Sequence, residues 1–272
     1  MPQPIITLTT DFGHHDHFVA TMKGTILSLC PGAQIIDVTH DITPFEISEG
    51  AFILMEAWRA FPRKTIHVGV VDPGVGSARR PILVEAGGHY FVGPDNGLFA
   101  MIYGPMLDGT GIDRNEPVRV RHLAKEQYFR QPVSRTFHGR DIFAPVAAHL
   151  AVGVTPAKFG PRIEDYLKLH NFWPTRTSKR TYTGQVLKID RFGNLISNFS
   201  ETEYAEIKTR PFALSIGTEK IQRLALNYAE VPFGEPVVII GSSGFVEVCV
   251  NQGNAAKQLG CGVGAPIELW LW

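Results

Sequence analysis

The chain has 272 residues, and its 26 Lys and Arg balance 26 Asp and Glu to a formal net charge of zero. With 44% hydrophobic and 19% charged residues, the composition is that of a folded globular protein and excludes disordered, fibrous and membrane-spanning classes. A neutral chain without Lys/Arg blocks lacks the attraction behind most nonspecific nucleic-acid affinity, so no nucleic-acid partner is expected. Because the sequence shows neither a charged and apolar leader nor an apolar run of membrane-spanning length, we expect no membrane partner and a cytoplasmic protein.

The three cysteines, Cys30, Cys249 and Cys261, are odd in number and lack CxxC spacing. Such a pattern favours buried free thiols over a disulfide framework or a thiolate zinc site.

The first half of the sequence alternates strand and helix patterns, which predicts an α/β domain. Strands are expected over 5–9, 34–38 and 65–71, and helices over 17–29, 43–61 and 141–151. The second helix is predicted to start with Thr43 as N-cap, Pro44 at its first position and Glu46 completing a capping box. Strands over 82–85 and 90–92 flank a Gly-Gly turn as a hairpin, so the sheet should be mixed.

A polar, aromatic stretch over 165–183 lacks periodicity and is typical of a linker between domains. We therefore expect an N-terminal α/β domain over 1–175 and a smaller C-terminal domain over 176–272. Short strand patterns in the second domain are separated by turn residues, which predicts an antiparallel β-barrel or sandwich. These strands are expected over 184–189, 195–199, 212–216, 236–240, 245–250 and 266–271.

Asp11 directly follows the first expected strand, at the sheet edge where α/β folds bind ligands. Its position is equally compatible with a ligand-binding carboxylate and with the N-cap of the next helix. Asp11-Phe12-Gly13 also spells the magnesium-binding triplet of protein kinases, but no HRD-type loop or glycine-rich phosphate loop precedes it. The kinase interpretation is therefore excluded.

The densest group of potential metal ligands is the run His14, His15, Asp16 and His17, which suggests a metallohydrolase as an alternative. Consecutive residues rarely converge on one ion, however, and the chain has no HExxH motif or other established ligand spacing. Packing at the start of the helix is the favoured role for this run.

The segment from Asp72 to Arg80 begins like a dinucleotide-binding loop, but Arg79 stands where the third glycine should be. What remains is an acid at a strand end with an arginine seven residues later, which is either a structural ion pair or part of a site. His138 lies in the loop before the expected helix, whose N-cap we expect to be Asp141. Together, Asp72, Arg79 and His138 could orient and deprotonate a water molecule.

In the second half, residues 190–194 (DRFGN) first suggest a hairpin turn. The loop 241–244 and the segment 251–256 flank the strand over 245–250. Glu247 would face inward among apolar neighbours on this strand and would need a partner, for which a ligand is one candidate.

Five segments in chain order carry a resemblance to a known family: TTDFG at 9–13, VDPGVGS at 71–77 with Arg79, FHGRDIFAP at 137–145, DRFGNLISN at 190–198 and VNQGNAA at 250–256. The chain resembles the S-adenosylmethionine hydrolase family, the hydroxide adenosyltransferases related to the S-adenosylmethionine-dependent fluorinase and chlorinase. The resemblance implies an α/β sandwich plus a small β-barrel, assembled as a homotrimer with active sites between subunits. It also implies attack of water or hydroxide on ribose C5′, giving adenosine and L-methionine with no metal or cofactor.

The resemblance assigns water activation to Asp72, Arg79 and His138, and the ribose hydroxyls to Asp11. Asp190 and Asn194 match residues that hold the methionine ammonium and the adenine edge, and Phe192 matches a wall for the base. Ser242 and Ser243 match a methionine-carboxylate site, although the halogenating relatives have an arginine after the serine where this chain has Gly244. The full predicted substrate-binding set is Asp11, Phe12, Asp190, Phe192, Asn194, Ser242, Ser243, Glu247, Asn251 and Ala255.

Three alternatives to hydrolysis stay open. Halide transfer to C5′ is disfavoured because the Asp72 carboxylate beside the nucleophile should repel an anion. A noncatalytic S-adenosylmethionine or adenosine sensor is disfavoured because every residue of the catalytic set is present. The third alternative is the metallohydrolase based on residues 14–17, which activity in a chelator would eliminate.

Overall fold

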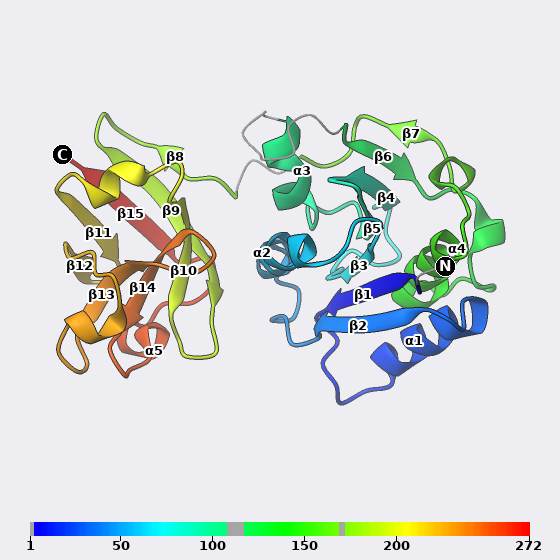
Figure 1. Cartoon of the computed structure of the whole chain (residues 1–272), viewed down its shortest axis with the longest axis horizontal. Coiled ribbons are helices and arrows are strands. Elements are labelled where there is room, and N and C mark those ends of the chain that lie inside the picture. Colours follow the sequence, from blue (N-terminus) through cyan, green and yellow to red (C-terminus); the bar gives the residue numbers. More distant parts are fainter. Residues whose placement is uncertain (1–2, 108–116, 169–171) are drawn as a thin grey trace. The chain divides into compact units, whose positions relative to one another are not determined.

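The computed structural model describes residues 3–107, 117–168 and 172–272. The chain divides into two compact units, Met1–Leu169 and His170–Trp272, compared with the boundary at 175 expected from the sequence. Figure 1 shows an α/β unit at the N-terminal end of the chain and a unit built almost entirely of strands at the C-terminal end. Within the described residues, no helix has both the length and the apolar character needed to span a membrane.

Unit 1 is built on a mixed seven-stranded sheet in the order β2-β1-β3-β5-β4-β6-β7. The parallel strands are β1 (Ile5–Thr10), β2 (Gln34–Thr39), β3 (Ile66–Val70) and β5 (His89–Pro94). The antiparallel strands are β4 (Pro81–Ala86), β6 (Arg119–His122) and β7 (Arg162–Ile163). The hairpin of β4 and β5 and the mixed sheet are thus confirmed.

Helices cover both faces of this sheet, α1 (Phe18–Leu29) and α4 (Ala144–Ala151) on one and α2 (Ile47–Ala57) and α3 (Ala100–Leu107) on the other (Figure 1). The first pair packs with alternate β1 side chains, Ile6 and Leu8, into a fully apolar core. Short 3-10 turns lie at Trp58–Ala60, Glu126–Tyr128 and Pro156–Lys158. Because β1 and β3 are parallel neighbours that end at Thr10 and Val70, the residues after them leave the same edge of the sheet.

The helix expected over 43–61 is shorter than predicted. It begins at Ile47, so Thr43 and Pro44 lie outside it and do not form the predicted cap. The Thr43 N–H instead donates to Glu49 Oε2 at 2.9 Å, which ties down the backbone before the helix begins. Phe45 has a φ of +71°, a left-handed conformation that no helix can continue through.

The start of α4 also differs from the prediction. A π-helical turn over Gly139–Phe143 precedes α4, and Asp141 lies inside this turn rather than at an N-cap. Its carboxylate is fully buried and forms ion pairs with Arg130 and Arg140, so it does not cap the helix. Single π-turns are often found at functional sites, and this one follows His138 directly.

Unit 2 is an antiparallel sheet in the order β12-β11-β15-β9-β10-β14-β13, with β8 (Thr175–Arg176) pairing β9. It curls into a nearly closed barrel around one apolar core (Figure 1). All six predicted strands are present, and the two additional ones, β8 and β12, are only two and three residues long. The strands are β9 (Thr181–Ile189), β10 (Leu195–Ser200), β11 (Phe212–Ile216), β12 (Glu219–Ile221), β13 (Pro236–Ile240), β14 (Phe245–Val250) and β15 (Pro266–Leu271), with 3-10 turns at Ala205–Lys208 and Tyr228–Glu230 and the helix α5 (Ala255–Leu259).

Candidate active site

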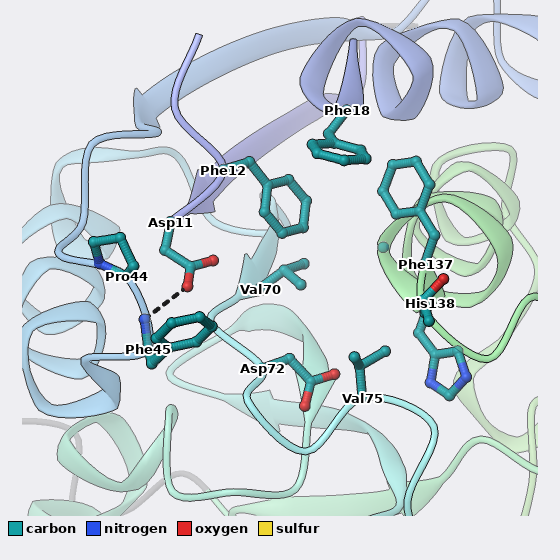
Figure 2. A pocket seen from close by; sticks show the side chains of 12 residues that line it. Asp11, Phe12, Phe18, Pro44, Phe45, Val70, Asp72, Val75, Phe137 and His138 are labelled. Atoms are coloured by element: carbon teal, nitrogen blue, oxygen red, sulfur yellow. Dashed lines mark hydrogen bonds between the residues drawn. The ribbon is translucent and has the colours of Figure 1, made fainter. Parts of the chain in front are cut away.

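A pocket of about 290 Å³ opens at the carboxyl edge of the sheet in unit 1 (Figure 2). Three of the predicted site residues, Asp11, Asp72 and His138, line it together. Its other walls are mostly apolar, which is the usual make-up of a small-molecule site with a few convergent polar groups. The remaining lining residues are Phe12, Phe18, Pro44, Phe45, Val70, Val75, Thr136, Phe137 and Gly139.

Asp11 is a wall of this pocket and not a helix cap. Its Oδ2 accepts a 3.0 Å hydrogen bond from the Phe45 N–H, drawn as a dashed line in Figure 2. The N-cap of α1 is His17, and within the described residues its side chain makes no capping hydrogen bond. Burial raises the pKa of Asp11, the Phe45 N–H opposes this rise, and the negative charge of Asp72 adds to it. The two carboxylates of the pocket, Asp11 and Asp72, therefore interact electrostatically.

Asp72, Arg79 and His138 form one connected group. Arg79 Nε donates to Asp72 Oδ1 at 2.9 Å and its Nη2 to Asp72 Oδ2, a bidentate pair in which the side chains are only 8% and 5% exposed. The same Nη2 lies 2.6 Å from His138 Nδ1. Because a guanidinium can only donate, Nδ1 is the acceptor, and a neutral His138 carries its proton on Nε2.

The protonation of His138 follows from its surroundings. Burial and the positive charge of Arg79 lower its pKa, while the charges of Asp72 and Asp141 and a hydrogen bond to the Ser134 backbone oppose the fall. The imidazole is therefore held in its neutral form beside the ion pair.

The loop from Asp72 to Arg79 folds back on itself so that its two ends meet. Val75 N–H donates to the Asp72 carbonyl, and the Ser77 hydroxyl to the Gly74 carbonyl. Gly76 has a φ of +75°, and a Cβ placed there would lie 2.1 Å from the Arg135 carbonyl oxygen. Glycine is required at this position because the loop must contact the backbone of the segment that leads to His138.

Asp141 fixes the other side of the group. Its carboxylate accepts from Arg140 Nε at 2.6 Å, from Arg130 Nη1 at 3.2 Å and from the Ser134 N–H at 2.9 Å. Although burial raises its pKa, the hydrogen bonds from Arg140, Ser134 and Arg130 lower it overall. The loop that carries His138 is thus closed on a buried, ionised carboxylate.

Aromatic side chains form a wall that the sequence did not identify as a unit. Phe137 packs edge to face with Phe12 and Phe18, and the latter two rings are tilted against each other, with ring centroids 5.1 to 6.0 Å apart in all three pairs. Figure 2 shows them gathered on one side of the pocket, with Phe45 near Asp11 on another. Of these, Phe12 belongs to the predicted substrate-binding set, and Phe137 precedes His138 in the segment 137–145 that carries the family resemblance. Nothing in a single sequence marks Phe18 and Phe45 as site residues, because aromatic residues in an ordinary apolar core occur at the same kind of position.

The side chains of the histidine-rich run 14–17 point to different surroundings. His14 packs its ring edge-on against His40 at 5.0 Å between centroids, and His15 is fully exposed. Within the described residues, no group of three or more His, Cys, Asp or Glu side chains is arranged to hold a metal ion.

In unit 2, Asp190 and Asn194 do lie together, in the hairpin turn between β9 and β10 that the sequence predicted. Asp190 accepts from the Phe192 N–H, the Asn194 N–H and Asn194 Nδ2 at 2.8 to 2.9 Å. Asn194 is buried, whereas the Phe192 ring is 76% exposed on the outside of the turn. This leaves Phe192 as an apolar surface available to a ligand or to another chain.

Glu247 lies close to this turn. It is buried on β14, 3.9 Å from the Cys249 thiol, and both groups influence Tyr228, a residue that the sequence did not single out. Burial raises the pKa of Tyr228, the charges of Glu247 and Asp190 add to this, and a hydrogen bond with Asn194 opposes it. The polar groups at this end of the barrel thus form one electrostatic cluster.

The remaining predicted residues divide into exposed and buried positions. Ser242 is exposed, while the Ser243 hydroxyl is buried and has no hydrogen-bond partner among the described residues. Asn251 Nδ2 donates to the Val231 carbonyl at 2.7 Å. Ala255 is completely buried in the barrel core, so its methyl group cannot reach a ligand and only its backbone could.

The fold and the site define a protein of two units. The α/β unit has a pocket in which a neutral histidine lies beside an Asp–Arg ion pair, and the β-barrel unit carries a polar cluster of its own. Comparison with known proteins shows the family. The SAM hydroxide adenosyltransferase N-terminal domain model matches residues 6–160, and the C-terminal domain model matches residues 184–268. The chain belongs to the SAM hydroxide adenosyltransferase family.

Individual relatives agree with this assignment. A protein of Salinispora tropica named (R)-S-adenosyl-L-methionine hydrolase is 38% identical, with 95% of each chain covered. A protein of Actinoplanes sp. named fluorinase is more distant, 26% identical with 93% of each chain covered. A crystal structure of an uncharacterized conserved protein from Thermotoga maritima matches with a TM-score of 0.84 and 32% identity, covering 97% of this chain and 99% of that one.

Proposed function

We propose that this chain hydrolyses S-adenosyl-L-methionine at ribose C5′ and releases adenosine and L-methionine. The observation that carries the proposal is the connected group of Asp72, Arg79 and His138 at a pocket that also contains Asp11. The name of the Salinispora tropica relative supports the (R) epimer at sulfur as the substrate form.

The chemistry requires little acid catalysis. A bond forms between the water oxygen and C5′ while the C5′–S bond breaks, and its electron pair neutralises the sulfonium to the thioether of methionine. The leaving group therefore needs no proton, and the difficult step is to orient and deprotonate water without a metal to lower its pKa.

We assign the proton to Asp72. His138 Nδ1 already accepts from Arg79, and a hydrogen bond with the Ser134 backbone also engages the ring. Arg79 occupies one direction at each Asp72 oxygen, but a carboxylate oxygen has two acceptor directions, so Asp72 can still bind a water in the pocket. Arg79 and His138 then orient the carboxylate, and the proton leaves from Asp72 to solvent.

The same carboxylate favours water over halide. An anion placed beside Asp72 and Asp11 would meet two negative charges, of which only that of Asp72 is balanced by Arg79. Halide transfer therefore stays a second candidate that the more distant fluorinase relatives raise and this pocket disfavours.

The finer features of the proposal follow the family resemblance. Asp11 and Phe12 hold the ribose end of the substrate, while the barrel supplies the adenine and methionine sites through the cluster around Asp190, Asn194 and Glu247. We propose a cytoplasmic homotrimer in which these two sets meet between neighbouring subunits, acting without a metal or cofactor. The exposed Phe192 ring supports a role for the barrel surface in such contacts.

The test uses chelator-treated protein with separate (R) and (S) epimers of S-adenosylmethionine in isotopically labelled water. We expect adenosine labelled at its 5′ oxygen from the (R) epimer, unaffected by the chelator and abolished by Asp72→Asn, which keeps the shape but not the charge. Unlabelled product, or product that depends on added halide or on restored metal, would refute hydrolysis by this site. Intact substrate under all conditions would indicate a binding protein.

A further inference from the structure

Two buried threonines on β1 make nearly the same hydrogen bond, but only one of them is next to the pocket. Thr7 Oγ1 lies 2.8 Å from His67 Nδ1, and Thr10 Oγ1 lies 2.9 Å from His40 Nδ1. Both hydroxyls are completely buried, and both histidines are 1% exposed. Thr7 lies in the middle of the strand, whereas Thr10 ends it and immediately precedes Asp11.

The polar chain at Thr10 has a defined direction. The Phe12 N–H donates to Thr10 Oγ1 at 3.2 Å, which leaves the Thr10 hydroxyl free to donate to His40 Nδ1. His40 then carries its proton on Nε2, which lies 3.1 Å from Asp37 Oδ1, and Lys23 Nζ lies 2.5 Å from Asp37 Oδ2. The contact between His40 Nε2 and the Asp37 carboxylate lacks hydrogen-bond geometry among the described residues, so the run of directed donors from the Asp11 loop ends at His40, next to a partly exposed ion pair at the surface.

The loop is held from both of its sides. The His40 carbonyl accepts the Gly13 N–H at 2.7 Å, so one residue fixes the backbone after Asp11 and, through Thr10, the backbone before it. The Asp11 carboxylate itself is anchored by backbone N–H groups, that of Phe45 on Oδ2 and its own, which leaves its direction dependent on the loop. Figure 2 shows Asp11 and Phe12 projecting from this loop into the pocket.

From this arrangement we propose that the Thr10–His40–Asp37 chain is a positioning network that sets the Asp11 carboxylate for the hydroxyls of its ligand. The inference rests on the proposed function, in which Asp11 binds the ribose diol. Thr10 and His40 touch no ligand and act through the loop, so their loss should be felt as weaker preference for a ribose over a deoxyribose.

The experiment compares Thr10→Val with its matched control Thr7→Val. Each replaces one buried hydroxyl by a methyl group and leaves one histidine Nδ1 without its partner, so both should lower the melting temperature, while only Thr10→Val also removes the acceptor of the Phe12 N–H. For each protein, kcat and KM are measured on S-adenosylmethionine and on its 2′-deoxyribose analogue. Thr10→Ser, which keeps the hydroxyl, serves as the rescue variant.

We expect the kcat/KM for S-adenosylmethionine divided by that for the 2′-deoxyribose analogue to fall about tenfold in Thr10→Val. This is the factor associated with weakening one hydrogen bond to a charged group. Thr7→Val should keep the wild-type ratio, and Thr10→Ser should restore it. Equal ratios in Thr10→Val and Thr7→Val would overturn the proposal while leaving hydrolysis intact. If the wild type does not hydrolyse the substrate, the proposed function fails, and the same ratio is read from adenosine and 2′-deoxyadenosine dissociation constants. Absence of any ribose preference there would overturn the network's role as well.

Discussion

The loop between Asp72 and Arg79 provides the sharpest test of how the site is held. In Gly76→Ala, the new Cβ would lie 2.1 Å from the Arg135 carbonyl oxygen, whereas real Cβ contacts essentially never fall under 3.0 Å. The loop and the segment leading to His138 must therefore separate by close to 1 Å, in addition to about 1–3 kcal/mol for the left-handed backbone of alanine. A displacement of about 1 Å at reacting groups costs roughly a hundredfold in rate. We expect kcat to fall by that factor, measured by release of adenosine.

Gly74→Ala is the matched control in the same loop. Its Cβ would meet side-chain atoms of Arg79 and Ser77 at 3.4 Å and of Asp72 at 3.9 Å, which are ordinary contact distances, and its backbone is not left-handed. Gly74→Ala should retain kcat within about threefold of the wild type, because little must move. The reasoning is wrong if the two variants have equal activity, or if Gly76→Ala keeps wild-type kcat with an unchanged melting temperature.

Three further predictions concern charge and pH. Arg79→Lys should lower kcat about a hundredfold with a normal circular dichroism spectrum, because one ammonium cannot hold both Asp72 oxygens and His138 together; unchanged kcat would contradict this. His67 has its pKa lowered to about 3 by burial, so the unfolded chain binds the proton first and stability falls as pH drops from 6.5 towards 3. The free energy of unfolding, measured with urea at several pH values in this window, should depend less steeply on pH in His67→Gln than in the wild type. The difference in slope should correspond to about one proton. Asp141→Asn should lower the free energy of unfolding by about 1–3 kcal/mol at neutral pH, with a smaller difference in acid, because the stabilising carboxylate of the wild type is lost as it protonates; a difference that grows in acid would contradict the ion-pair role.

Much of the fold follows from local patterns. The buried run that becomes β3 and the Gly-Gly hairpin of β4 and β5 are each specified by residues close in sequence. Unit 2 is similarly predictable, since every strand of five or more residues carries its own apolar pattern between turn residues. The strand β12, which the sequence did not predict, shows the limit of this approach, because three residues are too few to establish a period.

Three positions at which an N-cap was predicted or left open share a physical feature. Thr43, Asp11 and Asp141 are all residue types that favour helix N-caps, and each stands where a cap would be expected. In the structure, Glu49 satisfies the Thr43 N–H, and the carboxylates of Asp11 and Asp141 bind backbone and arginine groups instead. For the two aspartates a single sequence cannot distinguish the two uses, because both employ a carboxylate oxygen that accepts a backbone N–H.

The proposed catalytic group depends on contacts that are distant in sequence. Arg79 and His138 are 59 residues apart, and their 2.6 Å contact exists only because the loop after β3 meets the segment before α4. Gly76 and Asp141 produce that meeting, one by allowing the backbones to touch and the other by closing the His138 loop on a buried charge. A residue's presence in a motif therefore predicts its chemistry, whereas its orientation is decided by neighbours whose role appears only in three dimensions. Substitutions at Gly76 and Asp141 should accordingly reduce turnover without touching any group that binds the substrate.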